Sequence, residues 1–265
     1  MKRFGALGFI CAFFLLGCGE YKPPTSALDS LPTPKPYQYQ KAWEGSEKAY
    51  EEFQEADKIL KAGADLEEFK KAYLLLSSAG KAGNLQAICA IASLNRTGYG
   101  GFFKKNLQNA VKYFKIAAEK GYPPAQHDLG SRYAMGEGVE QDHKEAFKWY
   151  QASADQGLVL GWIKLAQAYE RGEGVNVDLK LAIQHYYLAA LSNKPVAQYN
   201  LAVLVAKSDI TSANKIDSHK WAIIAAANGY NNAVSLVKLQ QPLLTKEERE
   251  YAEKWAKEWL EKKQN

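Results

Sequence analysis

The 265-residue sequence is poor in cysteine, with only three. Cys11 lies inside an apolar run near the N-terminus, Cys18 follows that run, and Cys89 stands alone in the rest of the chain. A body with one thiol cannot form the internal disulfide framework on which many small secreted domains depend. Because residues 87–91 are all apolar, we interpret Cys89 as a packing residue.

The sequence also lacks a dominant charge. Lys and Arg number 34 against 29 Asp and Glu, for a net charge of +5, and no block of basic residues occurs. Nucleic-acid-binding proteins usually gather Lys and Arg into a patch or stripe. The charge pattern therefore argues against a nucleic-acid partner.

Catalytic motifs are missing as well. The chain contains no His-Glu-x-x-His, no Gly-x-Ser-x-Gly and no Walker-type loop, the motifs that supply zinc ligands, an exposed nucleophile or a phosphate cradle. Its histidines are spread along the chain, and we interpret them as structural: His127, His143, His185 and His219. We expect no catalytic, metal or cofactor site.

The N-terminus has the pattern of an export signal. Lys2 and Arg3 precede an apolar run over residues 4–16, which is too short for a comfortable permanent span. Residues 15–18, Leu-Leu-Gly-Cys, resemble the lipobox of bacterial lipoproteins. The resemblance implies a signal peptide over residues 1–17 and lipidation of Cys18. An ordinary signal peptide with an incidental cysteine and an uncleaved anchor helix are the alternatives.

Gly19 follows the predicted lipidation site, where lipoproteins retained in the inner membrane typically carry Asp. The resemblance therefore implies an outer-membrane lipoprotein, by default facing the periplasm, that contacts the membrane through its acyl chains. Residues 18–40 contain five of the nine prolines and no apolar periodicity. Proline-rich chains extend ~3.1 Å per residue, so this segment is expected to be a tether that reaches roughly 60 Å.

From residue 70 the sequence repeats itself. The segment 110–121 returns 36 residues later as 146–157, then as 182–193 and 218–229, and an earlier copy covers 72–83. A second motif alternates with the first. Its equivalent positions are Ala125, Leu129, Gly130 and Tyr133, then Gly161, Leu165, Ala166 and Tyr169, then Ala197, Leu201 and Ala202. A period of this length predicts a solenoid.

Each half of the repeat has apolar or small residues at helical spacing and predicts an amphipathic helix. Small residues at fixed positions let antiparallel helices approach closely, and aromatic pairs such as Trp149 and Tyr150 fill the space between units. Gly136 and Gly138 can adopt the positive φ needed where the chain reverses, and Gly157 stands where a helix needs a C′ residue. No unit buries its apolar face alone, so the units must stack.

This pattern resembles the Sel1-like repeat (SLR) family, a relative of the tetratricopeptide repeat. The matching text is Ala125-x3-Leu129-Gly130-x2-Tyr133-x2-Gly136-x-Gly138-Val139, then Ala146-x2-Trp149-Tyr150-x2-Ser153-Ala154-x2-Gly157. The resemblance covers residues 70–240 and implies an all-α fold, a right-handed α-solenoid of antiparallel helix pairs. The fourth unit departs from the pattern, because Ser208 replaces the first loop glycine.

Both ends of the repeats are expected to be capped, as solenoids require. Residues 41–69 predict an N-terminal capping helix, and residues 241–265 predict a C-terminal one. Thr245 and Glu248 have the spacing of a capping box at its start. Tyr251, Trp255 and Trp259 then recur every four residues along one face.

Solenoids present an extended concave face, which the first helix of each pair lines in tetratricopeptide relatives. That precedent predicts a mixed polar, charged and aromatic set of partner-binding residues: Gln86, Ser93, Arg96, His127, Ser131, Gln167, Glu170 and Tyr199. Such a mixture suits a protein ligand. The alternative is that these positions are ordinary solvated helix surface.

We therefore predict a non-enzymatic protein–protein interaction module tethered in the bacterial envelope. The resemblance implies, as its most specific form, an immunity or inhibitor protein against a periplasmic toxin such as a type VI secretion phospholipase effector. The alternative is an assembly scaffold lipoprotein of an envelope or exopolysaccharide secretion complex. A third hypothesis is a β-lactam or cell-wall hydrolase, although the cysteine-rich relatives that suggest it carry a disulfide in each repeat.

Overall fold

The computed structural model describes residues 22–34, 37–38, 40, 43–208 and 212–264. The predicted signal peptide and Cys18 lie outside this part of the chain. Within it every regular element is a helix, and none is long and apolar enough to cross a membrane. The elements are η1 (Ala27–Ser30), α1 (Glu47–Lys61), α2 (Leu66–Lys81), α3 (Leu85–Thr97), α4 (Leu107–Glu119), α5 (Pro123–Met135), α6 (His143–Asp155), α7 (Val159–Arg171), α8 (Leu179–Leu191), α9 (Pro195–Lys207), α10 (Ser212–Ala227), α11 (Asn231–Gln240), η3 (Gln241–Leu243) and α12 (Lys246–Gln264).

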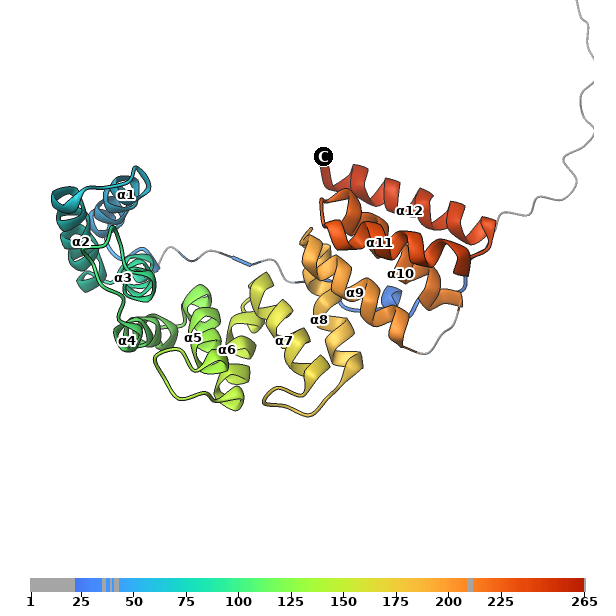
Figure 1. Ribbon diagram of the computed structural model, residues 1–265, viewed down its shortest axis with the longest axis horizontal. Helices are drawn as coiled ribbons and strands as arrows, with labels where there is room; N and C mark the ends of the chain where they lie inside the picture. The colour runs from blue at the N-terminus through green and yellow to red at the C-terminus, as the bar shows by residue number, and fades with distance from the viewer. Residues whose placement is uncertain (1–21, 35–36, 39, 41–42, 209–211, 265) are drawn as a thin grey trace, which may run out of the picture.

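The helices follow one another along an arch, with α1 at one end and α10–α12 at the other (Figure 1). Each helix packs mainly on its neighbours in the chain. Long loops close the pairs α3/α4, α5/α6 and α7/α8, while turns of about three residues join one pair to the next. The prediction of an all-α solenoid of helix pairs is confirmed.

Small residues form the contacts between helices, as the repeat predicts. The equivalent alanines and leucines of successive units are almost wholly excluded from solvent: Ala110, Ala146 and Ala182, and Leu129, Leu165 and Leu201. The aromatic residues Phe114, Tyr150 and Tyr186 are buried at the same interval of 36 residues. The register read from the sequence is therefore the register of the packed core.

The turn glycines also behave as predicted. Gly136 caps the C-terminus of α5 in the left-handed region, with φ of 67°. Gly157 follows α6 with φ of 83°. An L-residue adopts this conformation only under strain, so both positions require glycine.

The N-terminal cap differs from the single helix expected over residues 41–69. That range holds α1, a break, and the first turn of α2. The break has a local cause: Gly63 adopts φ of 86°, and the Asp65 side chain caps α2 in a capping box with Glu68. The cap is therefore a helix pair that extends the solenoid by one unit.

The C-terminal helix begins at the predicted capping box. The Thr245 amide donates to Glu248 Oε2 over 2.8 Å, and the Glu248 amide donates to Thr245 Oγ1 over 3.2 Å. The rings of Trp255 and Trp259 meet Trp221 of α10 edge to face, with centroids 5.8 and 5.6 Å apart. The aromatic face of α12 thus covers the last repeat.

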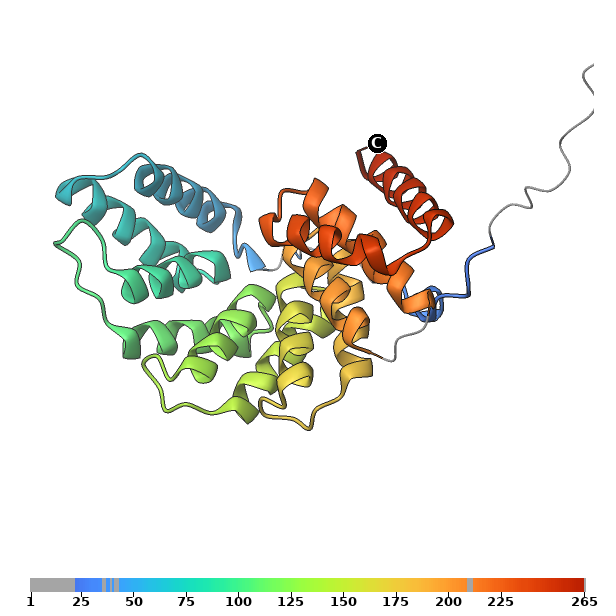
Figure 2. The same ribbon diagram turned by 45° about the vertical axis from the view of Figure 1, so that its right-hand side comes forward.

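The expected tether is not a free spacer over residues 22–34. Ser26 and Leu28 are buried, with 8% and 6% of their surface exposed, and Leu28 belongs to the main hydrophobic core. From η1 the chain crosses the open side of the arch back to the first helices (Figures 1 and 2). We call the described residues between 22 and 43 the strap. The strap is held by residues of the repeats that come near it only in the folded protein. Its own proline-rich composition therefore predicted an extended linker.

Candidate functional site

The predicted partner-binding residues all lie on the odd-numbered helices. Gln86, Ser93 and Arg96 belong to α3. The others follow on the equivalent helices of later units: His127 and Ser131 on α5, Gln167 and Glu170 on α7, and Tyr199 on α9. The structure thus places the set on one helix of each pair, although its members differ in what they contact.

Three members of the set join neighbouring helices. The Tyr150 hydroxyl donates to Ser131 Oγ over 3.3 Å, and the Tyr186 hydroxyl donates to Glu170 Oε2 over 3.0 Å. The ring of Tyr199 lies 4.9 Å from that of Tyr230. These hydrogen bonds and this ring contact lie inside the solenoid, where they hold one helix against the next.

Burial keeps these phenols protonated. Desolvation raises the pKa of Tyr150, and the same effect, with the nearby Glu170 carboxylate, raises the pKa of Tyr186. Both hydroxyls are hydrogen-bond donors at neutral pH, and Tyr150 also lines the adjacent pocket.

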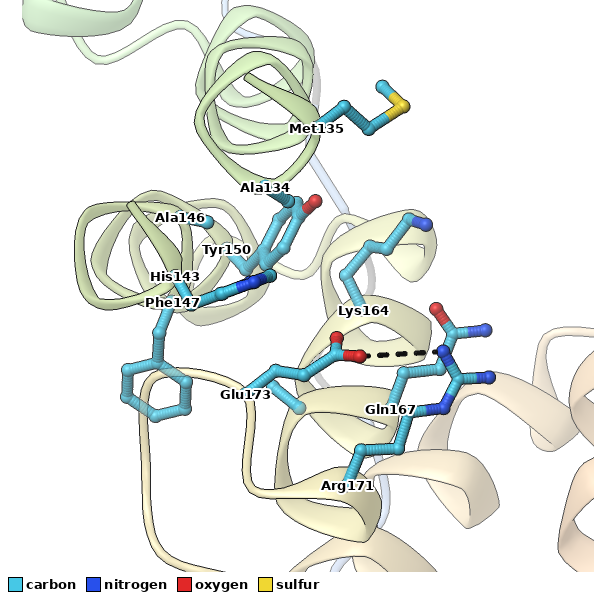
Figure 3. Close-up of a pocket in the computed structure, with 11 residues that line it drawn as sticks. Ala134, Met135, His143, Ala146, Phe147, Tyr150, Lys164, Gln167, Arg171 and Glu173 are labelled. Atoms are coloured by element: carbon cyan, nitrogen blue, oxygen red, sulfur yellow. Dashed lines mark ion pairs between the residues drawn. The ribbon is translucent and has the colours of Figure 1, made fainter. Parts of the chain in front are cut away.

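Gln167 lies in a pocket between the second and third repeat units (Figure 3). The pocket has a volume of about 190 Å³ and is open to solvent on one side. Helices α5, α6 and α7 and the loop after α7 build it. The side chains that line it include Met135, His143, Tyr150, Lys164, Gln167, Arg171 and Glu173.

One face of α7 supplies the longest polar side chains of this pocket. Lys164, Gln167 and Arg171 are spaced by three and four residues, which aligns them along a helix. Figure 3 shows them facing the rings of His143 and Tyr150, with the Glu173 carboxylate between. Arg171 and Glu173 form an exposed ion pair with N···O of 3.6 Å.

Apolar side chains flank this charged row. Met135 is 53% exposed and Leu160, one turn before Lys164, is 47% exposed. A flexible methionine beside long cationic side chains is a composition typical of adaptable protein-binding surfaces. We call Met135, Leu160, Lys164, Gln167 and Arg171 the α7 face.

His185, His219 and Cys89 are packing residues in the part of the chain that the structure describes. His219 is fully buried, and His185 stacks on Tyr169 with the ring planes 2° apart. Burial lowers the pKa of both histidines and raises the pKa of the Cys89 thiol. Among the described residues no three His, Cys, Asp or Glu side chains gather as metal ligands would.

Sequence reasoning missed Lys164, Arg171 and Met135. The signal was available, because positions 164, 167 and 171 form one polar helical stripe beside the apolar core positions 165, 166 and 168. His143 was considered only as a metal ligand or structural residue, and it proves to line the pocket.

Comparison with known proteins places the repeats in a family. Four segments match the family model of the Sel1 repeat, at residues 86–122, 123–158, 163–194 and 195–230, which together are more than half of the chain. No curated protein matches the chain significantly.

Solved structures share the fold. A protective antigen with an SLR fold, present in uropathogenic Escherichia coli strains, is 24% identical with a TM-score of 0.72, over 80% of this chain and 45% of that one. The chain thus spans less than half of that antigen. A Sel1 repeat protein from Oxalobacter formigenes is 24% identical with a TM-score of 0.64, over 84% and 87%. An immunity protein from Pseudomonas aeruginosa is 16% identical with a TM-score of 0.50, over 89% and 86%.

Proposed function

The chain belongs to the Sel1 repeat family, and we propose that it is an immunity or inhibitor protein that binds a toxic enzyme in the bacterial periplasm. Sel1 repeats are protein-interaction modules and are generally non-catalytic scaffolds. Within that class, the similarly folded immunity protein favours an inhibitor. The proposal is carried by one observation, the α7 face.

The α7 face suits a protein surface better than a small ligand. Its pocket has a volume of only about 190 Å³, and the half-buried Lys164 and Gln167 and the exposed Arg171 line it. Small-molecule sites are usually enclosed, apolar and larger, at about 300–1,000 Å³. Lys164 and Arg171, two turns apart on α7, would pair with carboxylates of the partner, while Met135 and Leu160 would pack on apolar groups beside them.

Inhibition by such a surface requires no chemistry from this chain. A partner enzyme held against α7 would lose access to its substrate because the solenoid covers the entrance to its active site. The helices beneath are fixed by the bonds of Tyr150 and Tyr186, so little conformational entropy would be lost when the partner binds. We assign no catalytic residue.

The location is part of the proposal. The lipobox-like residues 15–18 favour lipidation of Cys18, and two acyl chains hold a protein stably at a membrane. A lipoprotein of the outer membrane that faces the periplasm would meet a toxin before the toxin reached its lipid substrate. Mass spectrometry of the mature N-terminus tests the modification directly.

The function is tested by affinity capture. The chain from residue 19, without lipid, is used to purify partners from envelope extract. The double variant Lys164→Glu/Arg171→Glu should bind the partner at least tenfold more weakly than the wild-type chain does. Lys144→Glu/Lys180→Glu carries the same charge change on α6 and α8 and should retain it. The captured enzyme should lose activity when the wild-type chain is added.

The outcomes separate the alternatives. Recovery of one soluble enzyme, at about one copy per chain, supports the inhibitor. Recovery of a set of outer-membrane or integral membrane proteins would contradict the inhibitor and favour an assembly scaffold, provided that the Lys164→Glu/Arg171→Glu variant recovers the same set.

A further inference from the structure

The strap meets the solenoid along a second surface, formed by the short turns between helix pairs and by α10 around Asp217. We call this surface the short-turn rim. Ser26 contacts α10, residues 32–34 lie at the turn between α6 and α7, and Trp43 lies at the turn between α4 and α5. The strap therefore visits the repeats in the reverse of their order in the chain.

The first anchor of the strap is a buried polar contact. The Ser26 hydroxyl donates to the Asp217 carboxylate. Asp217 is also paired with Lys220, with N···O of 3.0 Å, and both side chains are buried. The Lys220 ammonium lies 4.8 Å from the centroid of Tyr251 and 5.0 Å from that of Trp255, on α12. The rim thus offers a fixed, charged acceptor to a hydroxyl group.

The second anchor is apolar. Leu28 is buried in the core cluster that contains Trp162 and Leu188, and Leu31 packs against the same cluster. Pro32, Thr33 and Pro34 then border a hollow of about 180 Å³ with Trp162 and Leu188 on its other side. Space therefore remains beside the prolines for larger side chains.

The third anchor is aromatic. The ring of Trp43 stacks on Tyr37 at 6.1 Å between centroids and meets Tyr122 edge to face at 5.3 Å. Just beyond, a Cβ on Gly45 would lie 2.8 Å from the Ala82 carbonyl oxygen and 2.9 Å from the Asn84 nitrogen. The chain passes the turn between α2 and α3 at a distance that glycine alone permits.

We propose that the short-turn rim is a peptide-binding surface for an extended segment of a partner protein, and that the strap is its resident, displaceable ligand. The strap shows the chemistry that the rim accepts: a hydroxyl, an apolar side chain two residues later, prolines, then an aromatic ring. The proposal goes beyond the proposed function because the rim is separate from the α7 face.

Displacement is physically reasonable because the strap is held at separate side-chain anchors. Its own backbone bonds are internal, from the Leu31 amide to the Leu28 carbonyl and from Trp43 to Gln40. A tethered ligand benefits from a high effective concentration, so a partner segment must match all three anchors to compete. Loss of one anchor should open the rim.

The test uses the chain from residue 19 and a fluorescent peptide copy of residues 22–43, with binding followed by anisotropy. Leu28→Asp places a charge in the apolar cluster and should release the strap. This variant should bind the peptide at least tenfold more tightly than the wild type does. Gln38→Asp introduces the same charge at an exposed strap residue outside the three anchors and should behave as the wild type. A peptide that itself carries Asp at position 28 should not bind.

A second variant opens the rim without any substitution in the hydrophobic core. A protease site inserted after Gln40 allows the strap to be cut from the folded chain, and the added peptide should then exchange with it. The proposal is overturned if neither opened form binds the peptide while its circular dichroism matches the wild type. Equal binding to wild type and variant would also overturn it. So would a wild-type chain that purifies as a dimer with exchanged straps.

Discussion

Gly174 lies directly against the main chain of His143, so that a Cβ atom on the glycine would overlap the carbonyl oxygen of the histidine. The same relationship joins Gly138 to Leu107, one repeat earlier. In both cases the second glycine of a loop touches the first residue of the second helix of the preceding pair. The Gly-x-Gly loops therefore connect consecutive units as well as reversing the chain.

We expect Gly174→Ala to destabilise the solenoid strongly, although the substitution adds only one methyl group. The substitution adds strain at φ of 77° and forces α6 away from the loop. Together these effects should lower the free energy of unfolding by about 2–4 kcal/mol. Urea unfolding followed by circular dichroism measures the change.

Gly121→Ala is the matched control. Gly121 has a similar φ of 84°, but a Cβ there would meet no atom within 4 Å. Only backbone strain remains, so a loss of about 1 kcal/mol is expected. Equal losses for the two variants would show that the loop does not support the preceding unit.

Lys220→Ala should be strongly destabilising because it leaves the buried Asp217 carboxylate without its ion pair. Breaking a buried pair from one side typically costs about 3–5 kcal/mol. Limited proteolysis should then cut the strap and α12 faster, since both pack on this pair. The exposed pair of Lys148 and Glu145 is the control, and Lys148→Ala should leave unfolding unchanged. An equal loss of unfolding free energy in Lys220→Ala and Lys148→Ala would contradict the buried ion pair of Lys220 and Asp217.

Cys89 should be unreactive while the protein is folded. Its thiol packs beside the cluster around Phe114 and Leu129, and burial, aided by Asp128, raises its pKa. Because the thiolate is the reacting species, a disulfide reagent at pH 8 should modify the folded chain at least tenfold more slowly than the chain in guanidinium. Equal rates would mean that this part of the first repeat unit opens readily.

Acidification should destabilise the fold through its buried histidines. Burial lowers the folded-state pKa of His185 and of His219, whose neighbours include Gln240, Glu253 and Arg249. His219 Nε2 and His185 Nδ1 have no hydrogen-bond partner among the described residues. Below the ordinary pKa of 6.5, the unfolded chain takes up protons that the folded chain does not. Stability is therefore complete above that pH and falls below it.

The measurement is the free energy of unfolding between pH 7.5 and 5. It should decrease by at most about 1.4 kcal/mol per pH unit for each histidine. The variant His185→Gln/His219→Gln removes both groups and should flatten this dependence. An unchanged slope in the variant would assign the effect to other residues.

The repeat core could be predicted because each of its positions is determined by near neighbours. Leu129 and Ala146 recur every 36 residues and meet only their own or the adjacent unit, so periodicity alone locates them. The strap could not be found in this way. Ser26 meets Asp217, 191 positions later, and nothing in the composition of residues 18–40 encodes that partner.

The sequence also predicted only part of the candidate site, because some of its features depend on the folded arrangement of the helices. The precedent of related repeats predicted a set that lies on the odd-numbered helices and includes the pocket residue Gln167, but it did not separate pocket-lining positions from those that join helices. Glu170 and Tyr199 contact Tyr186 and Tyr230 of neighbouring segments, whereas Lys164 and Arg171 line the open pocket. That distinction depends on the rotation of each helix about its axis, which one sequence leaves open.

The packed strap sets how far the protein could reach from a membrane. Ser26 is eight positions after Cys18, and a fully extended chain of that length spans at most about 29 Å. An acyl group on Cys18 would therefore hold the α10 end of the arch close to the bilayer, at about half the reach of a free tether. The α1 end lies at the other end of the arch (Figure 1), so such an anchor would restrain the two ends of the solenoid unequally.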